Sequence, residues 1–363
     1  MSVVLLILGI LLFIGLVVVH EFGHFLAARR NGVDVEEFGI GFPPRAWKRD
    51  TKKGFIFSLN WLPIGGFVRL KGESDAATEK GSFGAASLKT KTKIMLAGVG
   101  MNLVAAFVIF TALGWIGMPQ LIENQYSVQS DTKVVQRQVL VGYVEAGSPA
   151  QKAGLQTRDQ LVSVGGTKVE SAAKLPALTK KYAGKQVEVT YIHGGKTQTA
   201  TVHLRTAAQA KDKGMLGVAP AEFTLTRATW SAPVQAVGLI GQFTEATFKG
   251  LGTALGALFQ GDAKTASEQV SGPVGIIVVL RDGSLLGYQF VLLIIGLISL
   301  SLAIMNVLPI PALDGGRFYV LLLSRVFGKK LSQEMEERIV GTSFVFLLLL
   351  IALITVVDVK RFF

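Results

Sequence analysis

Four long apolar segments constrain the fold of this chain more than any other feature of its sequence. We predict that residues 1–27, 94–118, 288–316 and 340–357 each form a transmembrane helix, because a helix needs roughly 20 apolar residues to cross the hydrocarbon of a bilayer. Half of the 363 residues are hydrophobic and only 17% are charged. The sequence therefore predicts a polytopic α-helical membrane protein, with the lipid bilayer as a partner.

The net charge of +12 first suggests nucleic acid as a partner. The basic residues, however, are concentrated in residues 28–93, between the first two apolar segments, and few aromatic residues are interleaved with them. Cytosolic loops beside transmembrane helices carry such an excess of Lys and Arg. We therefore place this loop in the cytosol and expect no binding of nucleic acid.

The stretch "FIFSLNWLPIGGFVRL" in that loop predicts a membrane-associated β-hairpin. Strand-forming residues flank Pro63 and the pair Gly65–Gly66, which are typical of a turn. Two interpretations stay open. The hairpin either packs under the membrane as a structural element, or it presents an edge that pairs with an unwound peptide. In the second interpretation Gly65 and Gly66 are substrate-binding residues.

Residues 127–206 predict one small soluble α+β domain, because short strand-like runs alternate there with Gly-rich and polar turns. Residues 223–287 are predicted as an extracytoplasmic amphipathic linker. Within this linker, Pro233–Phe259 is almost apolar enough for a fifth span, but it contains Gln, Glu and Lys side chains and many glycines. We expect it to lie in or against the outer leaflet without crossing.

The motif "HEFGH" at residues 20–24 contains the ionisable residues at the end of the first apolar segment. His20 and His24 are four residues apart, so on a helix they share one face. That spacing suits two imidazoles that bind one zinc ion, with Glu21 beside it as a general base. The alternative is a pair of hydrogen-bonded structural histidines at a helix end. The chain has no cysteine, which excludes thiolate ligands.

Asp314 in "NVLPIPALDGGRF" is the candidate third ligand. Pro309 and Pro311 would break a helix before it, and the two glycines after it would let backbones approach closely. Irregular backbone at membrane depth is tolerated where it lines a cavity. The alternative is that Asp314 caps a helix at the membrane surface.

Counting membrane crossings places the candidate ligands on one side. If the basic loop is cytosolic, the first helix ends in the cytosol, with His20 and His24 near that end. The small domain is then extracytoplasmic. The third helix returns Asp314 to the cytosolic side, provided that Pro233–Phe259 does not cross.

Two motifs together resemble the site-2 protease family of intramembrane zinc metalloproteases, in particular the bacterial regulator-of-sigma-E protease type. They are "HEFGH" at 20–24 and "NVLPIPALDGG" at 306–316. The stretches "FGIGFPPR", "LPIGGFVRLKGE" and "SGPVGI" also resemble family segments. Residues 127–206 resemble a PDZ domain, in one copy, through "SPAQKAGLQTRDQLVSVGG".

The resemblance implies roles for single residues. His20, His24 and Asp314 would bind zinc, one ion per chain, and Glu21 would be the catalytic acid and base. Asn306 would hold substrate backbone or the oxyanion, although a helix–helix hydrogen bond is an equal alternative.

The resemblance also implies an activity and a location. The chain would cleave within transmembrane helices of pre-trimmed single-pass proteins, such as anti-sigma factors or signal-peptide remnants, in the bacterial inner membrane. The PDZ domain would bind a C-terminal peptide or act as a size filter that excludes bulky ectodomains, and both roles stay open.

Two other classes of protein are alternatives. A catalytically silent scaffold that presents a PDZ domain is disfavoured, because both motifs are complete. A metal transporter with His and Asp ligands is disfavoured because the sequence shows no internal repeat across its halves.

Overall fold

The computed structural model describes residues 2–122, 124–210, 213–328 and 332–363. The chain divides into two compact units. The helical unit comprises Met1–Leu113 and Ala232–Phe363, and the sheet unit comprises Gly114–Ser231. Each unit is built around its own apolar clusters.

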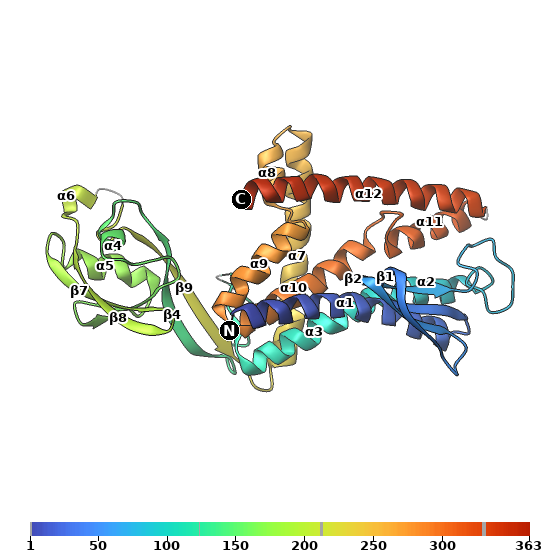
Figure 1. Cartoon of the computed structure of the whole chain (residues 1–363), viewed down its shortest axis with the longest axis horizontal. Coiled ribbons are helices and arrows are strands. Elements are labelled where there is room, and N and C mark those ends of the chain that lie inside the picture. Colours follow the sequence, from blue (N-terminus) through green and yellow to red (C-terminus); the bar gives the residue numbers. More distant parts are fainter. Residues whose placement is uncertain (1, 123, 211–212, 329–331) are drawn as a thin grey trace. The chain divides into compact units, whose positions relative to one another are not determined.

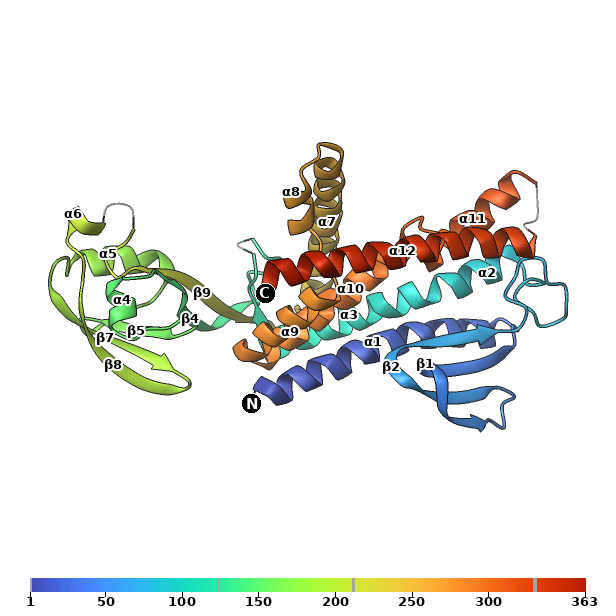
Figure 2. The ribbon, with the colours of Figure 1, turned by 45° about the horizontal axis from the view of Figure 1, so that its top comes forward.

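Within the described residues, 4 helical segments are long and apolar enough to cross a membrane. They are α1 (Ser2–Arg30), α2 with α3 (Leu88–Met95 and Ala97–Ile116), α10 (Tyr288–Val307) and α12 (Gln333–Phe362). In both views α1, α3 and α10 run side by side (Figures 1 and 2). The chain therefore has the helices of a membrane protein in addition to β-structure.

The third apolar segment differs from the predicted span over 288–316. Helix α10 ends at Val307, and a separate helix, α11 (Asp314–Val326), begins at the predicted ligand. Leu308 has an extended backbone with ψ 151°, the conformation that a following proline favours. The two prolines of the motif therefore end the helix before Asp314, as the sequence indicated for this stretch, so the predicted single helix was too long.

The loop between the first two apolar helical segments contains two long strands, β1 (Val35–Asp50) and β2 (Ile56–Leu70), which pair with each other. Residues 37–40 of β1 lie opposite both residues 66–69 and residues 56–59 of β2. The chain therefore changes sides of β1 between these two stretches of β2. The sequence predicted two strands joined by a turn, whereas the structure has one continuous strand that crosses over at Pro63 and the two glycines.

A buried polar network fixes the segment that follows β2. The ammonium of Lys91, which is 0% exposed, donates to Asp75 and to the backbone oxygen of Gly84. Asp75 also accepts a hydrogen bond from Arg325 of α11, at 3.0 Å, and its backbone N–H donates to Glu336 of α12. The network therefore joins α2, α11 and α12 through one loop.

Residues 223–287 differ from the predicted linker. Beyond the strand that ends at Arg227, they form α7 (Ala232–Phe259), α8 (Ala263–Glu268) and α9 (Pro273–Leu286). Helix α9 begins in the motif "SGPVGI", and the buried carboxylate of Asp358 accepts hydrogen bonds from the N–H groups of Gly272 and Gly275 there. These contacts cap the start of α9. The location of α7 in the outer leaflet stays a prediction.

The sheet unit contains one mixed-length sheet with strand order β3-β9-β4-β5-β7-β8, in which β6 pairs with β5. Its elements are β3 (Met118–Pro119), β4 (Lys133–Val144), α4 (Pro149–Lys152), β5 (Gln160–Val164), β6 (Thr167–Lys168), the 3-10 helix η1 (Ala172–Lys174), α5 (Leu175–Lys180), β7 (Gln186–His193), β8 (Lys196–His203), α6 (Ala207–Ala210) and β9 (Val218–Arg227). The predicted domain over 127–206 lacked β9, which pairs with β4 along its length and is separated from it by a long sequence interval.

We expect the buried network to contribute measurably to stability. Asp75→Ala leaves the buried ammonium of Lys91 without its carboxylate, so the free energy of unfolding should fall by about 3–5 kcal/mol. Adding Lys91→Met to that variant should restore much of the loss. Thermal and denaturant unfolding in detergent micelles would measure both changes.

The matched control is Glu334→Ala, which removes an exposed ion pair with Arg338 on α12. Its effect should stay below about 1 kcal/mol. Equal effects of Asp75→Ala and Glu334→Ala would contradict a stabilising role of the network.

Candidate metal centre

The two histidines of α1 share one face of the helix, as their spacing predicted. Their Nε2 atoms are 3.2 Å apart, and their rings meet edge to face. His20 is buried, with 8% of its surface exposed. Two ring nitrogens at this separation, both turned toward the same point, form one half of a metal-binding arrangement.

The structure brings Asp314 to the same point. Its Oδ2 atom is 3.1 Å from His20 Nε2 and 3.2 Å from His24 Nε2. Asp314 is the first residue of α11, and the glycines that follow are required by packing. A Cβ on Gly315 would lie 2.4 Å from the Val307 oxygen, and one on Gly316 would lie 1.9 Å from the Ile310 oxygen. The glycines therefore let α11 start directly against the chain that precedes it.

The three donor atoms fit a zinc ion. Donor atoms around a tetrahedral zinc lie about 3.3 Å apart, because its bonds to N and O are about 2.0–2.1 Å long. The observed separations are 3.1, 3.2 and 3.2 Å. Asp314 Oδ2 is also buried without a hydrogen-bond partner among the described residues. His20, His24 and Asp314 are the only such group found in the described part of the chain.

Helices α2 and α3 contact both histidine rings and help to position them. His24 Nδ1 lies 2.8 Å from the backbone oxygen of Ile94, to which it donates, so in the neutral ring Nε2 is the unprotonated nitrogen. Gly98 lies directly against both rings, and a Cβ there would be 2.5 Å from His20 Cε1 and from His24 Nε2. The absence of a side chain at Gly98 therefore makes room for the imidazoles.

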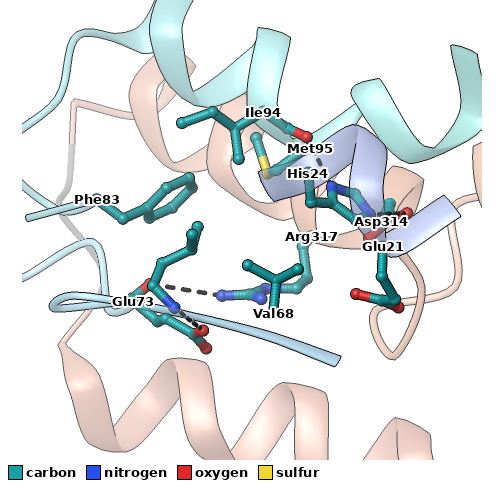
Figure 3. Close-up of a pocket in the computed structure, with 10 residues that line it drawn as sticks. Glu21, His24, Val68, Glu73, Phe83, Ile94, Met95, Asp314 and Arg317 are labelled. Carbon is teal, nitrogen blue, oxygen red and sulfur yellow. Dashed lines mark hydrogen bonds and ion pairs between the residues drawn. The ribbon is translucent and has the colours of Figure 1, made fainter. Parts of the chain in front are cut away.

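A cavity of about 160 Å³ opens beside the donors. Its lining residues are Glu21, His24, Val68, Leu70, Glu73, Phe83, Ile94, Met95, Asp314 and Arg317. Figure 3 shows Glu21, His24 and Asp314 grouped at one end and Glu73 at the other, with Arg317 between them. The carboxylate of Glu21 thus borders the same space as two of the three candidate ligands, where it can exchange protons with water.

The other predicted residues lie at different distances from this centre. Gly66 borders Glu21, since a Cβ there would be 3.4 Å from Glu21 Cγ. Gly65 has φ +93° and packs on the ring of Phe42. The Asn306 amide donates to the Leu302 oxygen within α10, at 2.9 Å, and Asn306 is not among the cavity-lining residues. Its predicted role in substrate binding stays a prediction.

Gly98 and Arg317 are parts of the site that lie outside the predicted motifs. Small residues in apolar helices mark close helix–helix contacts, and this signal could have identified Gly98. The hydrogen bond to the Ile94 oxygen left no signal in the sequence, because it depends on backbone.

Comparisons with known proteins agree with this chemistry. The family model described as Peptidase family M50 matches residues 8–350. A Clostridium perfringens protein named a zinc metalloprotease is 30% identical over 356 residues, which cover 97% of this chain and 98% of the relative. Zinc metalloprotease RasP of Shouchella clausii is 26% identical over 440 residues, covering 98% of each chain.

The PDZ domain of the SdrC-like protein from Listeria monocytogenes is among the solved structures that match. The match has 24% identity and a TM-score of 0.22, and it covers 24% of this chain and 93% of that chain.

Gly98→Ala tests the packing of the metal centre. The added methyl group would displace both imidazoles, so zinc affinity should fall by at least about tenfold. Gly100→Ala on the same helix meets no atom within 4 Å and should bind zinc like the wild type. Metal analysis after dialysis against a graded series of chelator concentrations measures the difference. Equal zinc retention by the two variants would contradict the assigned geometry.

Proposed function

Because this chain belongs to peptidase family M50, the site-2 protease family, and is a zinc metalloendopeptidase, we propose that it cleaves peptide bonds within transmembrane helices. The observation that carries the proposal is the location of the centre. His20 and His24 follow an uncharged run over residues 2–19 in the same helix, α1. Ionisable groups at such a depth are costly unless they serve a function.

We further propose that the substrates are pre-trimmed single-pass membrane proteins, such as anti-sigma factors or signal-peptide remnants. Cleavage of such remnants in the bilayer is regulated intramembrane proteolysis. Apolar side chains such as Val68 and Met95 line part of the cavity beside the metal centre, and they suit an apolar substrate segment.

His20, His24 and Asp314 would hold one zinc ion per chain. When bound, zinc polarises a carbonyl group and lowers the pKa of water at the site to about 7. The carboxylate of Glu21 accepts a proton from water in the cavity and returns it to the amine of the leaving peptide. Gly98 and the Ile94 oxygen keep the imidazoles in position while this occurs.

A helical substrate must unwind before cleavage, and strand addition to β2 would replace its lost hydrogen bonds. Residues 66–69 pair with residues 37–40 of β1 on one side only, and no described strand lies on the other side. Val68 and Leu70 on this stretch also line the catalytic cavity. This edge of β2 has no strand partner among the described residues, although the Leu70 N–H donates to Glu73 there. Its location beside the centre supports a role as the substrate-binding edge.

The proposed topology has four membrane spans in the bacterial inner membrane. The basic residues at the end of α1 and in the following loop favour a cytosolic location for that loop and for the active site. The sheet unit, as a PDZ domain, is then extracytoplasmic. Helix α7 is not among the helices that meet the length and hydropathy needed for a span within the described residues.

Two roles for the sheet unit follow from this proposal. Residues 218–223 of β9 pair with β4 but not with β3, which reaches only Leu225 and Thr226. Their other side has no strand partner among the described residues, which favours addition of a C-terminal peptide there. A size filter that excludes bulky ectodomains is the alternative role.

Glu21→Gln tests the catalytic proposal. The amide cannot accept the proton, so the rate of cleavage of a reporter transmembrane helix should fall by about 10²–10⁴-fold or more. Zinc content and expression should match the wild type. Cleavage in reconstituted proteoliposomes and metal analysis of the same preparation give both readouts.

The control is Glu73→Gln, since Glu73 lines the same cavity but its carboxylate accepts a hydrogen bond from Leu70 N–H, which Gln can replace. It should retain most of the activity. Near-normal cleavage by Glu21→Gln, with zinc bound, would rule out Glu21 as the acid and base.

Cysteine cross-linking tests strand addition, because the chain contains no native cysteine. In the Glu21→Gln background, Val68→Cys should form a disulfide with a reporter helix that has one cysteine near its cleavage position. Lys48→Cys lies on the opposite edge of the same sheet, in the stretch that pairs with residues 56–60. It should cross-link at least about tenfold less, and equal yields at the two edges would contradict the proposed mode.

A further inference from the structure

Asn102 on α3 is a buried polar residue beside the metal centre that the catalytic proposal does not use. Its side chain is 0% exposed, and its Nδ2 atom lies 3.2 Å from Nδ1 of His20. Its Oδ1 atom is buried without a hydrogen-bond partner among the described residues. A buried amide oxygen without a partner lowers the stability of a protein by about 1–3 kcal/mol, so an unused acceptor at this position requires an explanation.

The environment of His24 supplies that explanation. His24 Nδ1 meets a backbone acceptor, the Ile94 oxygen, at 2.8 Å, which directs its Nε2 lone pair toward Asp314. His20 has the same Nε2 orientation toward Asp314, but the group beside its Nδ1 is the Asn102 amide. A histidine that binds metal through Nε2 almost always donates its Nδ1–H to an acceptor. His20 therefore also needs an acceptor at Nδ1.

A half-turn of the Asn102 amide meets this need. The oxygen and nitrogen of an amide are nearly equal in size, so the turn exchanges their positions without changing the packing. Oδ1 then accepts from His20 Nδ1–H, and the unpaired oxygen and the ring proton satisfy each other. Ser299 Oγ of α10 donates a hydrogen bond to the backbone oxygen of Asn102, at 2.8 Å, and this contact holds the backbone of Asn102 in place.

We propose that Asn102 is a positioning residue of the zinc centre: its Oδ1 accepts the Nδ1 proton of His20 and so keeps His20 Nε2 unprotonated and aimed at the metal. The inference rests on the proposed function, since it requires that these ligands bind zinc. The proposal also implies that the two histidines are oriented by different kinds of group. The orientation of His24 depends on backbone, whereas that of His20 depends on a side chain that mutation can remove.

Three variants test the inference. Asn102→Leu has a similar volume but no acceptor, and its zinc affinity should fall by about 10–100-fold. Asn102→Asp keeps an acceptor oxygen and should bind zinc with an affinity close to that of the wild type. Thr111→Val on the same helix removes a different buried polar group, a hydroxyl that has no partner among the described residues. As the matched control, it should leave zinc affinity unchanged.

The measurement is competition for zinc between the purified full-length protein in detergent and a chromophoric chelator. Thermal unfolding of the metal-free protein is recorded in parallel. A positioning role predicts that Asn102→Leu lowers zinc affinity while the metal-free protein unfolds at the wild-type temperature. If Asn102→Leu does not fold, Asn102→Ala removes the same acceptor without adding volume and carries the same expectation.

The outcomes separate the two proposals. If the wild type binds zinc and the Leu and Ala variants bind it equally well, the role of Asn102 is overturned while the proposed function stands. If Asn102→Asp binds as weakly as the Leu variant, the acceptor is not what matters, and the inference also fails. If the wild type binds no zinc, the proposed function fails and this inference with it.

Discussion

The structure depends on bringing three electron-pair donors together in an apolar environment. His20, His24 and Asp314 direct one donor atom each toward a single point, with separations of 3.1–3.2 Å. Without a cation such a cluster is costly, because three polar groups have been withdrawn from water in an apolar environment. Bound zinc turns the same geometry into a source of stability. The metal centre therefore links α1 and α11 energetically as well as chemically.

Close helix packing follows from that constraint. A Cβ on Gly23 would lie 2.6 Å from the Ala97 oxygen, and one on Gly98 would strike both imidazoles. A Cβ on Gly315 or Gly316 would likewise strike the backbone that precedes α11. Glycine in a helix is unfavourable by about 1 kcal/mol relative to alanine. At these positions the loss is offset by contacts that a side chain would prevent, so the glycines around the centre serve its geometry.

The parts of the site that were predictable are those set by local spacing. His20, Glu21 and His24 follow from a four-residue repeat on one helix, and the break before Asp314 follows from its prolines. The acceptors for the ring Nδ1 atoms were not predictable, because the Ile94 oxygen and Asn102 reach the histidines only through packing of α2 and α3. Strand β9 was missed for the same reason, since its partner β4 lies far away in the sequence.

The proposed hydrolysis in a membrane also requires water at the centre, and polar side chains outside α1 line the space that leads to it. Glu73 and Arg317 border the catalytic cavity and also a larger cavity of about 570 Å³. Arg317 is joined to the Glu73 oxygen and to Glu336 of α12. Polar side chains from the loop after β2, from α11 and from α12 thus continue away from the candidate zinc ligands. Helix α1 supplies two of the three candidate ligands and α11 supplies the third, while the elements on the loop side supply the polar path that a hydrolytic reaction needs.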